Sequence, residues 1–219
     1  MTIRKQKVWA IIGQKGGDGK STVAYALSYF LARKGSKTAL IDVDRPQFSS
    51  VLLSKLWDLE ASKKTDGPVK PKLSFDLLRC QNSRDIPRIS EGYEAIVFDG
   101  APHASVETLN ICRTADCIVI PTRTYTINLK PAFDIAAELT ANGIDKRKII
   151  FLISQALSDS EVRDARETIA ARGYRVASED LRTYAAYGKA GNAGRSVLEV
   201  SFPTLRERAE TIFTELANT

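Results

Sequence analysis

The sequence predicts an α/β fold, a single domain in which one mostly parallel, twisted sheet is flanked by helices. Short apolar runs such as Val8–Ile12 and Cys117–Pro121 alternate with longer segments whose apolar residues recur at helical spacing. Strands buried on both faces have nearly continuous apolar runs, and strand–helix alternation is typical of parallel sheets. The 219 residues suffice for one such core, so we expect residues 1–219 to form a single domain.

The expected elements follow from apolar spacing and from helix-terminating residues. We expect strands at 8–12, 38–44, 73–78, 93–99, 117–121, 148–153 and 174–177, and helices at 21–33, 48–59, 85–90, 103–114, 129–141, 158–172 and 203–216. Gly35, Gly143 and Gly173 end three of these helices. Ser158 and Glu161 have capping-box spacing. The polar, lysine-containing segment 61–72 is expected to be a basic surface loop rather than a domain linker.

A glycine-rich stretch, Gly13–Thr22, lies between the first strand and the first helix. Glycines allow consecutive backbone N–H groups to turn toward an anion, and the following helix adds its positive N-terminal end. This placement predicts a phosphate-binding loop formed by Gly16, Gly17, Asp18, Gly19, Lys20, Ser21 and Thr22. Lys20 would reach the β- and γ-phosphates, Ser21 would ligate Mg²⁺, and Thr22 would contact an inner phosphate. The common G-x-x-x-x-G-K-[ST] spacing is missed by one position, because Gln14 stands where its first glycine belongs.

Acidic residues end two further predicted strands. Asp42 and Asp44 close the strand 38–44, and Asp99 closes the strand 93–99. Residues two apart in a strand point to the same face, and ligands of open α/β sheets bind at the carboxyl edge. We therefore expect Asp42 and Asp44 to act on Mg²⁺ or on an attacking water. Asp99 has the Walker B position, whose carboxylate holds Mg²⁺, usually through water.

Composition excludes several other classes of protein. The apolar runs are too short to span a membrane, and the N-terminus does not resemble a signal peptide. Cys80, Cys112 and Cys117 lack metal-ligand spacing and are expected to be free thiols in a reducing cytoplasm. The lone histidine, His103, argues against a histidine-rich metal site. A net charge of +6 is compatible with a polyanionic partner.

Three separated motifs together resemble the ParA/MinD family of P-loop NTPases, and the resemblance covers nearly the whole chain. The segment 15–22 is similar to the family's deviant Walker A motif, K-G-G-x-G-K-[ST]. Asp42-Val43-Asp44 followed by Pro46-Gln47 is similar to its second motif, and Asp99-Gly100-Ala101-Pro102 to its third. The greatest likeness is to short ParA proteins of the plasmid-partition type. Arg45 interrupts the Asp-Pro-Gln run of the family, and Ser154-Gln155 stands where relatives often place an adenine-reading Asn.

The resemblance implies a mechanism. Lys15, as the signature lysine, would reach across a homodimer interface to the partner's nucleotide, and two ATP molecules would be sandwiched between subunits. Asp42 and Asp44 would position water and support Mg²⁺, with Asp99 completing the outer shell of the metal. The resemblance thus implies an Mg²⁺-dependent ATPase whose hydrolysis a partner protein accelerates.

The resemblance also implies a biological role, the partitioning or positioning of DNA, with a plasmid as the expected cargo. The ATP-bound dimer would bind nonspecific DNA through Lys and Arg contacts to phosphates, with a ParB-like DNA-binding adaptor as partner. The protein would be cytoplasmic and nucleoid-associated, with no membrane partner. The basic residues proposed for DNA contact are Arg172, Arg175, Arg182, Lys189 and Arg195.

Several alternatives remain open. A MinD-like or other cargo-positioning ATPase would use a membrane or the nucleoid as its track, although the terminal helix 203–216 is not a basic amphipathic helix. A bacterial tyrosine kinase domain shares the Asp42–Pro46 pattern, but it would lack the signature lysine and would carry a tyrosine-rich tail. The Arg45 insertion also permits a nucleotide-binding module with little hydrolysis. An iron–sulfur protein is disfavoured by the placement of Cys112 and Cys117.

Overall fold

A computed structural model describes residues 6–14, 16–43, 55–56, 74–80, 83–102 and 105–219. Within these residues, eight strands form one sheet in which every pair is parallel. The strands are β1 (Lys7–Gly13), β2 (Thr38–Asp42), β3 (Asp76–Arg79), β4 (Ala95–Pro102), β5 (Cys117–Thr122), β6 (Ile149–Ala156), β7 (Arg175–Val176) and β8 (Leu181–Arg182). Their order is β3-β2-β4-β1-β5-β6-β7, and β8 pairs with the end of β6. The predicted α/β class and the parallel sheet are confirmed.

The central strands are buried on both faces, as their continuous apolar runs predict. Successive side chains of β1 alternate between two cores: Trp9 and Ile11 join one cluster, whereas Ala10 and Ile12 join the other. All four are at most 2% exposed. Each core is sealed by helices, so the sheet separates two hydrophobic layers and leaves its carboxyl edge for polar residues.

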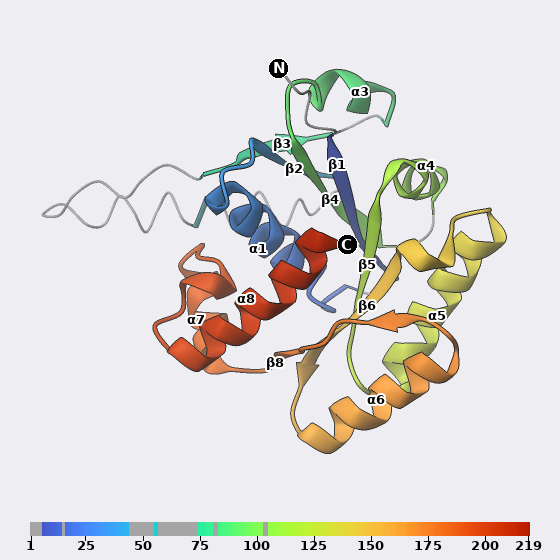
Figure 1. The fold of residues 1–219 in the computed structure, drawn as a ribbon, viewed down its shortest axis with the longest axis vertical. Helices are drawn as coiled ribbons and strands as arrows, with labels where there is room; N and C mark the ends of the chain where they lie inside the picture. Colours follow the sequence, from blue (N-terminus) through green and yellow to red (C-terminus); the bar gives the residue numbers. More distant parts are fainter. Residues whose placement is uncertain (1–5, 15, 44–54, 57–73, 81–82, 103–104) are drawn as a thin grey trace, which may run out of the picture.

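Helices cover both faces of the sheet (Figure 1). The helices on one face are α1 (Lys20–Arg33), α7 (Ala185–Asn192) and α8 (Pro203–Asn218), and those on the other are α3 (Ile86–Ile89), α4 (Val106–Thr114), α5 (Thr126–Ala141) and α6 (Asp159–Ala171). The terminal helix α8 buries Ala209, Ile212, Phe213 and Leu216 against the core that also contains α1. No helix of the described segments is long and apolar enough to cross a lipid bilayer.

Several predicted boundaries change in the structure. β2 ends at Asp42 rather than Asp44, and α5 begins at Thr126 rather than Leu129. α4 begins at Val106, because the Ser105 side chain accepts a hydrogen bond from the Thr108 N–H and caps the helix. α6 begins after Ser158, which caps it as predicted. The predicted strand 73–78 is shifted to β3, whereas most of the predicted helix 48–59 and the predicted loop 61–72 lie outside the described residues.

Among the strands and α-helices of the described segments, β8 and α7 were not predicted from the sequence. β8 has only two residues, too few for any periodicity to show. α7 contains Gly188 and Gly191, which lower helix propensity by about 1 kcal/mol each relative to alanine. Tertiary contacts compensate: Tyr187 in α7 donates its hydroxyl hydrogen to the Leu205 carbonyl at 2.7 Å.

Candidate functional site

The glycine-rich stretch forms the connection between β1 and α1, as predicted. Gly17 and Gly19 have φ values of 87° and 92°, a left-handed conformation that residues with a Cβ rarely adopt. Gly19 is the N-cap of α1, and its carbonyl accepts the first helical hydrogen bond from Val23 N–H at 2.9 Å. The backbone therefore turns sharply just before the helix, and the helix N-terminus faces the turn, which is the arrangement of an anion site.

Lys20, Ser21 and Thr22 form the first turn of α1. The Lys20 side chain is directed back toward the loop, because a Cβ added at Gly13 would lie 3.4 Å from Lys20 Cδ. Lys20 is 6% exposed, Ser21 is half-buried and Thr22 is exposed. A buried cation and two hydroxyl-bearing residues thus surround the turn on the helix side.

Asp42 and Asp99 lie next to each other at the carboxyl edge of the sheet. They are register partners in the parallel pair β2–β4, and both are fully buried. Gly100 permits this arrangement, because a Cβ at that position would lie 2.7 Å from the Ile11 carbonyl oxygen of β1. The close approach of β4 to β1 therefore requires glycine directly after Asp99 and brings this carboxylate near the phosphate loop.

Two predicted catalytic residues, Lys15 and Asp44, lie outside the described residues, as do Arg45 and His103. The backbone of Gly16 is described and forms part of the turn. Of the predicted nucleotide and metal residues, the structure therefore brings together Gly16–Thr22, Asp42 and Asp99. Their roles toward ATP and Mg²⁺ stay predictions.

Three polar side chains hold the loop from β5 and β6, a role that the sequence did not reveal for any of them. Ser154 donates its hydroxyl hydrogen to the Asp18 carbonyl at 2.9 Å, and Gln155 Nε2 donates to the Gly17 carbonyl at 2.6 Å. Arg123 Nη2 donates to the same Gly17 carbonyl at 3.1 Å. Gln155 has a φ of 53°, the one positive value among the described non-glycine residues. Strained backbone of this kind is concentrated at functional sites.

A cavity of about 310 Å³ adjoins the loop. Gly19 and Thr22 line its loop side, and Ser154 and Gln155 line the end of β6. β8, α7 and the segment around Arg195 complete its walls. The two elements that the sequence did not reveal therefore form the cavity next to the phosphate loop.

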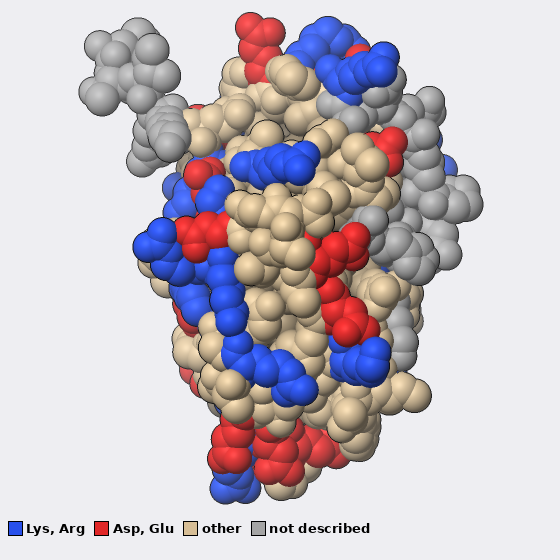
Figure 2. All heavy atoms as spheres, turned by 90° about the vertical axis from the view of Figure 1, so that its right-hand side faces the viewer, with Lys and Arg blue, Asp and Glu red and all other residues tan. Residues whose placement is uncertain are grey.

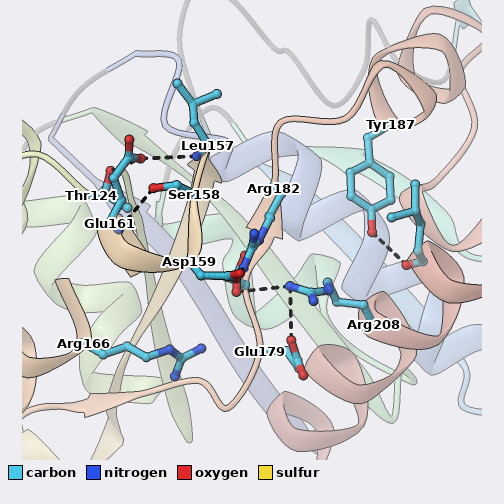
Figure 3. A network of polar contacts seen from close by, with 12 residues as sticks. Thr124, Leu157, Ser158, Asp159, Glu161, Arg166, Glu179, Arg182, Tyr187 and Arg208 are labelled. Atoms are coloured by element: carbon cyan, nitrogen blue, oxygen red, sulfur yellow. Dashed lines mark hydrogen bonds and ion pairs between the residues drawn. The ribbon is translucent and has the colours of Figure 1, made fainter. Parts of the chain in front are cut away.

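An ion-pair network fixes the β8 wall of this cavity (Figure 3). Arg182 on β8 pairs with Asp159 at the start of α6 and with Asp180, whose Oδ2 is 2.9 Å from Arg182 Nε. Asp180 is also paired with Arg208 of α8 at 3.2 Å, and Arg208 reaches Glu179 at 3.4 Å. The Asp180 side chain is only 4% exposed. Asp180 thus joins β8 to α8, and Arg182 joins β8 to α6 on the other face of the sheet.

A second network joins the loops that follow β5 and β6 (Figure 3). Glu161 accepts hydrogen bonds from the Leu157 N–H, the Tyr125 hydroxyl and the Thr124 hydroxyl, at 3.0–3.3 Å. The backbone bond from Leu157 and the two hydroxyl bonds lower the pKa of Glu161, because all three stabilise its charged form. The carboxylate thus fixes both loops next to the phosphate turn.

The five basic residues predicted to contact DNA do not form one surface. Arg172 and Arg175 are exposed near the end of α6 and the start of β7, where Lys146 and Arg147 also lie, as the Lys146–Arg172 and Arg175–Arg147 hydrogen bonds show. By contrast, Arg182 is engaged in its ion pairs, Arg195 lines the cavity and Lys189 is exposed on α7. On the face that Figure 2 presents, basic side chains occur in separate groups interspersed with acidic ones.

The residues present fit a magnesium–nucleotide ligand. The positive-φ glycines and the N-terminus of α1 suit phosphate oxygens, and Lys20 adds a buried cation. The Ser21 hydroxyl and the carboxylates of Asp42 and Asp99 are hard oxygen donors, the kind that Mg²⁺ prefers. The adjoining cavity would hold the nucleoside portion.

The comparisons agree with this geometry. Residues 9–176 match the model of the CobQ/CobB/MinD/ParA nucleotide binding domain. The chain is 27% identical over 204 residues to the maintenance of carboxysome distribution protein A of Gloeobacter kilaueensis, covering 92% of this chain and 88% of that protein. It is 30% identical over 133 residues to the chromosome-partitioning ATPase Soj of Thermus thermophilus, covering 51% of this chain and 53% of that protein.

Among solved structures, the MinD cell division protein of Aquifex aeolicus has a TM-score of 0.74 and 20% identity, covering 97% of this chain and 98% of that one. This likeness confirms the fold predicted from the sequence. The family match spans the phosphate loop, both buried acids and most of the sheet. Solved structures of the same fold hold AMPPNP or Mg-ADP, in agreement with the predicted ATP and Mg²⁺. The chain therefore belongs to the CobQ/CobB/MinD/ParA nucleotide-binding family, and its assignment as an ATPase of the ParA/MinD type is confirmed.

Proposed function

We propose that this protein is an ATP-driven switch that partitions or positions an intracellular cargo, DNA in the first instance. One observation carries the proposal: the phosphate turn, two buried carboxylates and a cavity of about 310 Å³ occupy the same edge of the sheet. Relatives whose names refer to chromosome partitioning and carboxysome distribution support a positioning role. Residues 1–219 would act as a single ATPase domain.

The proposed roles of the site residues follow their positions. Bound Mg²⁺ supplies charge neutralisation to the phosphate groups. Lys20 and the N–H groups of 16–22 bind phosphate oxygens, and Ser21 offers its hydroxyl to the metal. Asp99 would help to hold the metal. Asp42 and Asp44 would hold the attacking water, and Lys15 would approach the nucleotide of a partner subunit.

A nucleotide-dependent homodimer is supported by exposed apolar side chains near the phosphate turn. Tyr125, Ile127 and Leu157 are 54%, 72% and 68% exposed. Tyr125 and Ile127 follow β5, and Leu157 follows β6. Arg123, two residues before Tyr125, and Gln155, two residues before Leu157, contact the loop. Exposed apolar side chains gathered on one side of a protein are typical of an interaction surface. Burial against a second copy would close the site from water.

The proposed track is nonspecific DNA, reached by the ATP-bound dimer, with a ParB-like adaptor on the cargo and a plasmid as the first candidate cargo. The structural candidate for phosphate contacts is the group of exposed Arg147, Arg172 and Arg175 with half-buried Lys146. A MinD-like membrane track is less favoured, because the apolar face of α8 is buried in the core. The protein would accordingly be cytoplasmic and nucleoid-associated.

Binding to random-sequence duplex DNA tests this proposal, measured with ATP, ADP and no nucleotide over a salt series. We expect binding with ATP only, and affinity that falls steeply as salt rises. Arg175→Ala is expected to weaken binding to all sequences alike and to reduce the salt slope by about 1, whereas Lys34→Ala, exposed at the end of α1, serves as the comparison. If ATP drives dimerisation but the dimer binds no DNA, the track would instead be a membrane or a protein. ATP binding without phosphate release would instead indicate a nucleotide-binding module.

A further inference from the structure

An acidic residue belongs to the phosphate turn itself. Asp18 lies between Gly17 and Gly19, the two glycines of positive φ, and its side chain is only 8% exposed. Its carbonyl accepts the Ser154 hydrogen bond, so the residue is fixed in place. A buried carboxylate so close to a polyanion-binding turn raises the energy of the bound state, because like charges repel strongly where water is excluded. A cation beside Asp18 would offset this repulsion.

Arg123 is positioned to supply this compensation. It directly follows β5, and its Nε lies 3.6 Å from Asp18 Oδ1. Its Nη2 donates to the Gly17 carbonyl, and a Cβ added at Gly17 would lie 3.5 Å from the same nitrogen. The guanidinium therefore spans two consecutive loop residues, contacting the charge of one and the carbonyl of the other. Its side chain is 42% exposed and remains accessible at the site.

We propose that Arg123 is a positioning residue that neutralises Asp18 and holds the Gly17 carbonyl, so that the turn accepts a polyphosphate. The proposal rests on the proposed function, since it concerns the same nucleotide site. The positive charge of Arg123 matters to nucleotide binding because Asp18 is negatively charged. Gln155 donates to the same carbonyl without a charge and provides an internal comparison.

The test is the affinity for ATP, measured by calorimetry with Mg²⁺ present. Arg123→Ala is expected to weaken ATP binding roughly tenfold, a modest effect for a charge pair because Arg123 is partly exposed. Arg123→Lys is expected to retain most of the affinity, and Asp18→Asn combined with Arg123→Ala to restore the part that depends on the charge of Asp18. Adding Asp18→Asn to Gln155→Ala is not expected to restore the affinity for ATP, because Gln155→Ala removes a hydrogen bond rather than a charge.

Thermal unfolding without nucleotide provides the second measurement. Arg123→Ala is expected to lower the melting temperature more in the wild-type background than in the Asp18→Asn background. Rescue of stability without rescue of ATP affinity would overturn the proposal, as would wild-type affinity in Arg123→Ala or unrescued affinity in the double variant. If the wild-type protein bound no ATP, the proposed function would fall together with this inference. If instead the wild-type protein bound ATP and the Arg123→Ala variant bound it equally well, only this inference would fall.

Discussion

At the scale of single residues, the site depends on a few buried polar groups in an apolar sheet. Lys20, Asp42 and Asp99 are each at most 6% exposed. Burial of charge is costly unless it is compensated, so such groups persist where they face one another or a ligand. The thiols of Cys112 and Cys117 illustrate the opposite case, because burial raises the pKa of both to about 12 and keeps them uncharged.

Replacement of Lys20 by alanine is expected to weaken ATP binding about 100-fold, because two or more charge-assisted phosphate contacts are lost. The helix should persist, since alanine has the highest helix propensity. Titration with a fluorescent ATP analogue measures the loss. Lys34→Ala, exposed at the other end of α1, is the control and should bind normally. Equal affinity of the Lys20 variant and the wild-type protein would contradict the assigned role.

The two buried thiols give a prediction about pH. Their pKa of about 12 in the folded protein exceeds the ordinary value of 9.0, so between these values the folded state holds protons that the unfolded chain releases. Stability is therefore complete below pH 9 and falls as pH rises toward 12, by at most about 1.4 kcal/mol per pH unit for each thiol. Urea unfolding at pH 8 and pH 10 measures the difference. A Cys112→Ala, Cys117→Ala variant should show a smaller fall.

At the scale of elements, part of the cavity wall is formed by the strand and the helix whose local sequence predicts secondary structure least clearly. β8 has two residues and α7 contains two glycines, yet both line the cavity. They are held by long-range contacts: the Tyr25 hydroxyl donates to the Gly194 carbonyl at 2.8 Å, and Asp180 pairs with arginines from β8 and α8. Partial burial raises the pKa of Tyr187 to about 12, so its hydroxyl stays protonated as a donor to Leu205.

Asp180→Asn is expected to destabilise the protein by about 1–2 kcal/mol, less than a fully buried pair, because each arginine keeps another acid. The melting temperature should fall by about 2–8 °C for a chain of this size. Scanning calorimetry measures this shift. Asp159→Asn is the control, since its side chain is 87% exposed and should change the melting temperature little. A larger fall in the melting temperature of the Asp159→Asn variant would mean that Asp159 stabilises β8 more than Asp180 does.

At the scale of the whole molecule, the parallel sheet collects residues distant in sequence at one edge. The phosphate turn follows β1, Asp42 ends β2, Asp99 lies in β4, and Arg123 and Gln155 belong to the ends of β5 and β6. In a parallel sheet all carboxyl ends meet at the same edge. The exposed apolar residues Tyr125, Ile127 and Leu157 lie beside this site, which is why nucleotide and partner binding are expected to be coupled.

Ile127→Glu is therefore expected to weaken ATP-dependent dimerisation at least tenfold while leaving the monomer folded, because the side chain is 72% exposed. Analytical ultracentrifugation with a slowly hydrolysed ATP analogue measures the association. Ala137→Glu is the matched control: it is exposed on the same helix, about 15 Å further along. Dimerisation that resists Ile127→Glu would remove this surface from the interface.

The sequence by itself determined the fold class, the phosphate turn and the buried acids at the ends of β2 and in β4. These features depend on local signals: apolar runs, glycines before a helix, and carboxylates that follow a strand. The central strands and the helices α1, α6 and α8 were predicted nearly to their ends for the same reason.

The tertiary structure alone decided what holds the turn and what forms the cavity. Arg123 and Gln155 reach Gly17 across more than a hundred residues of sequence, and Gln155 adopts a positive φ that its residue type rarely takes. β8 and α7 form because Asp180, Tyr187 and their partners fix them. Such contacts depend on strand order and helix placement, so they leave no periodic signal in the sequence, and only the folded chain brings these side chains together.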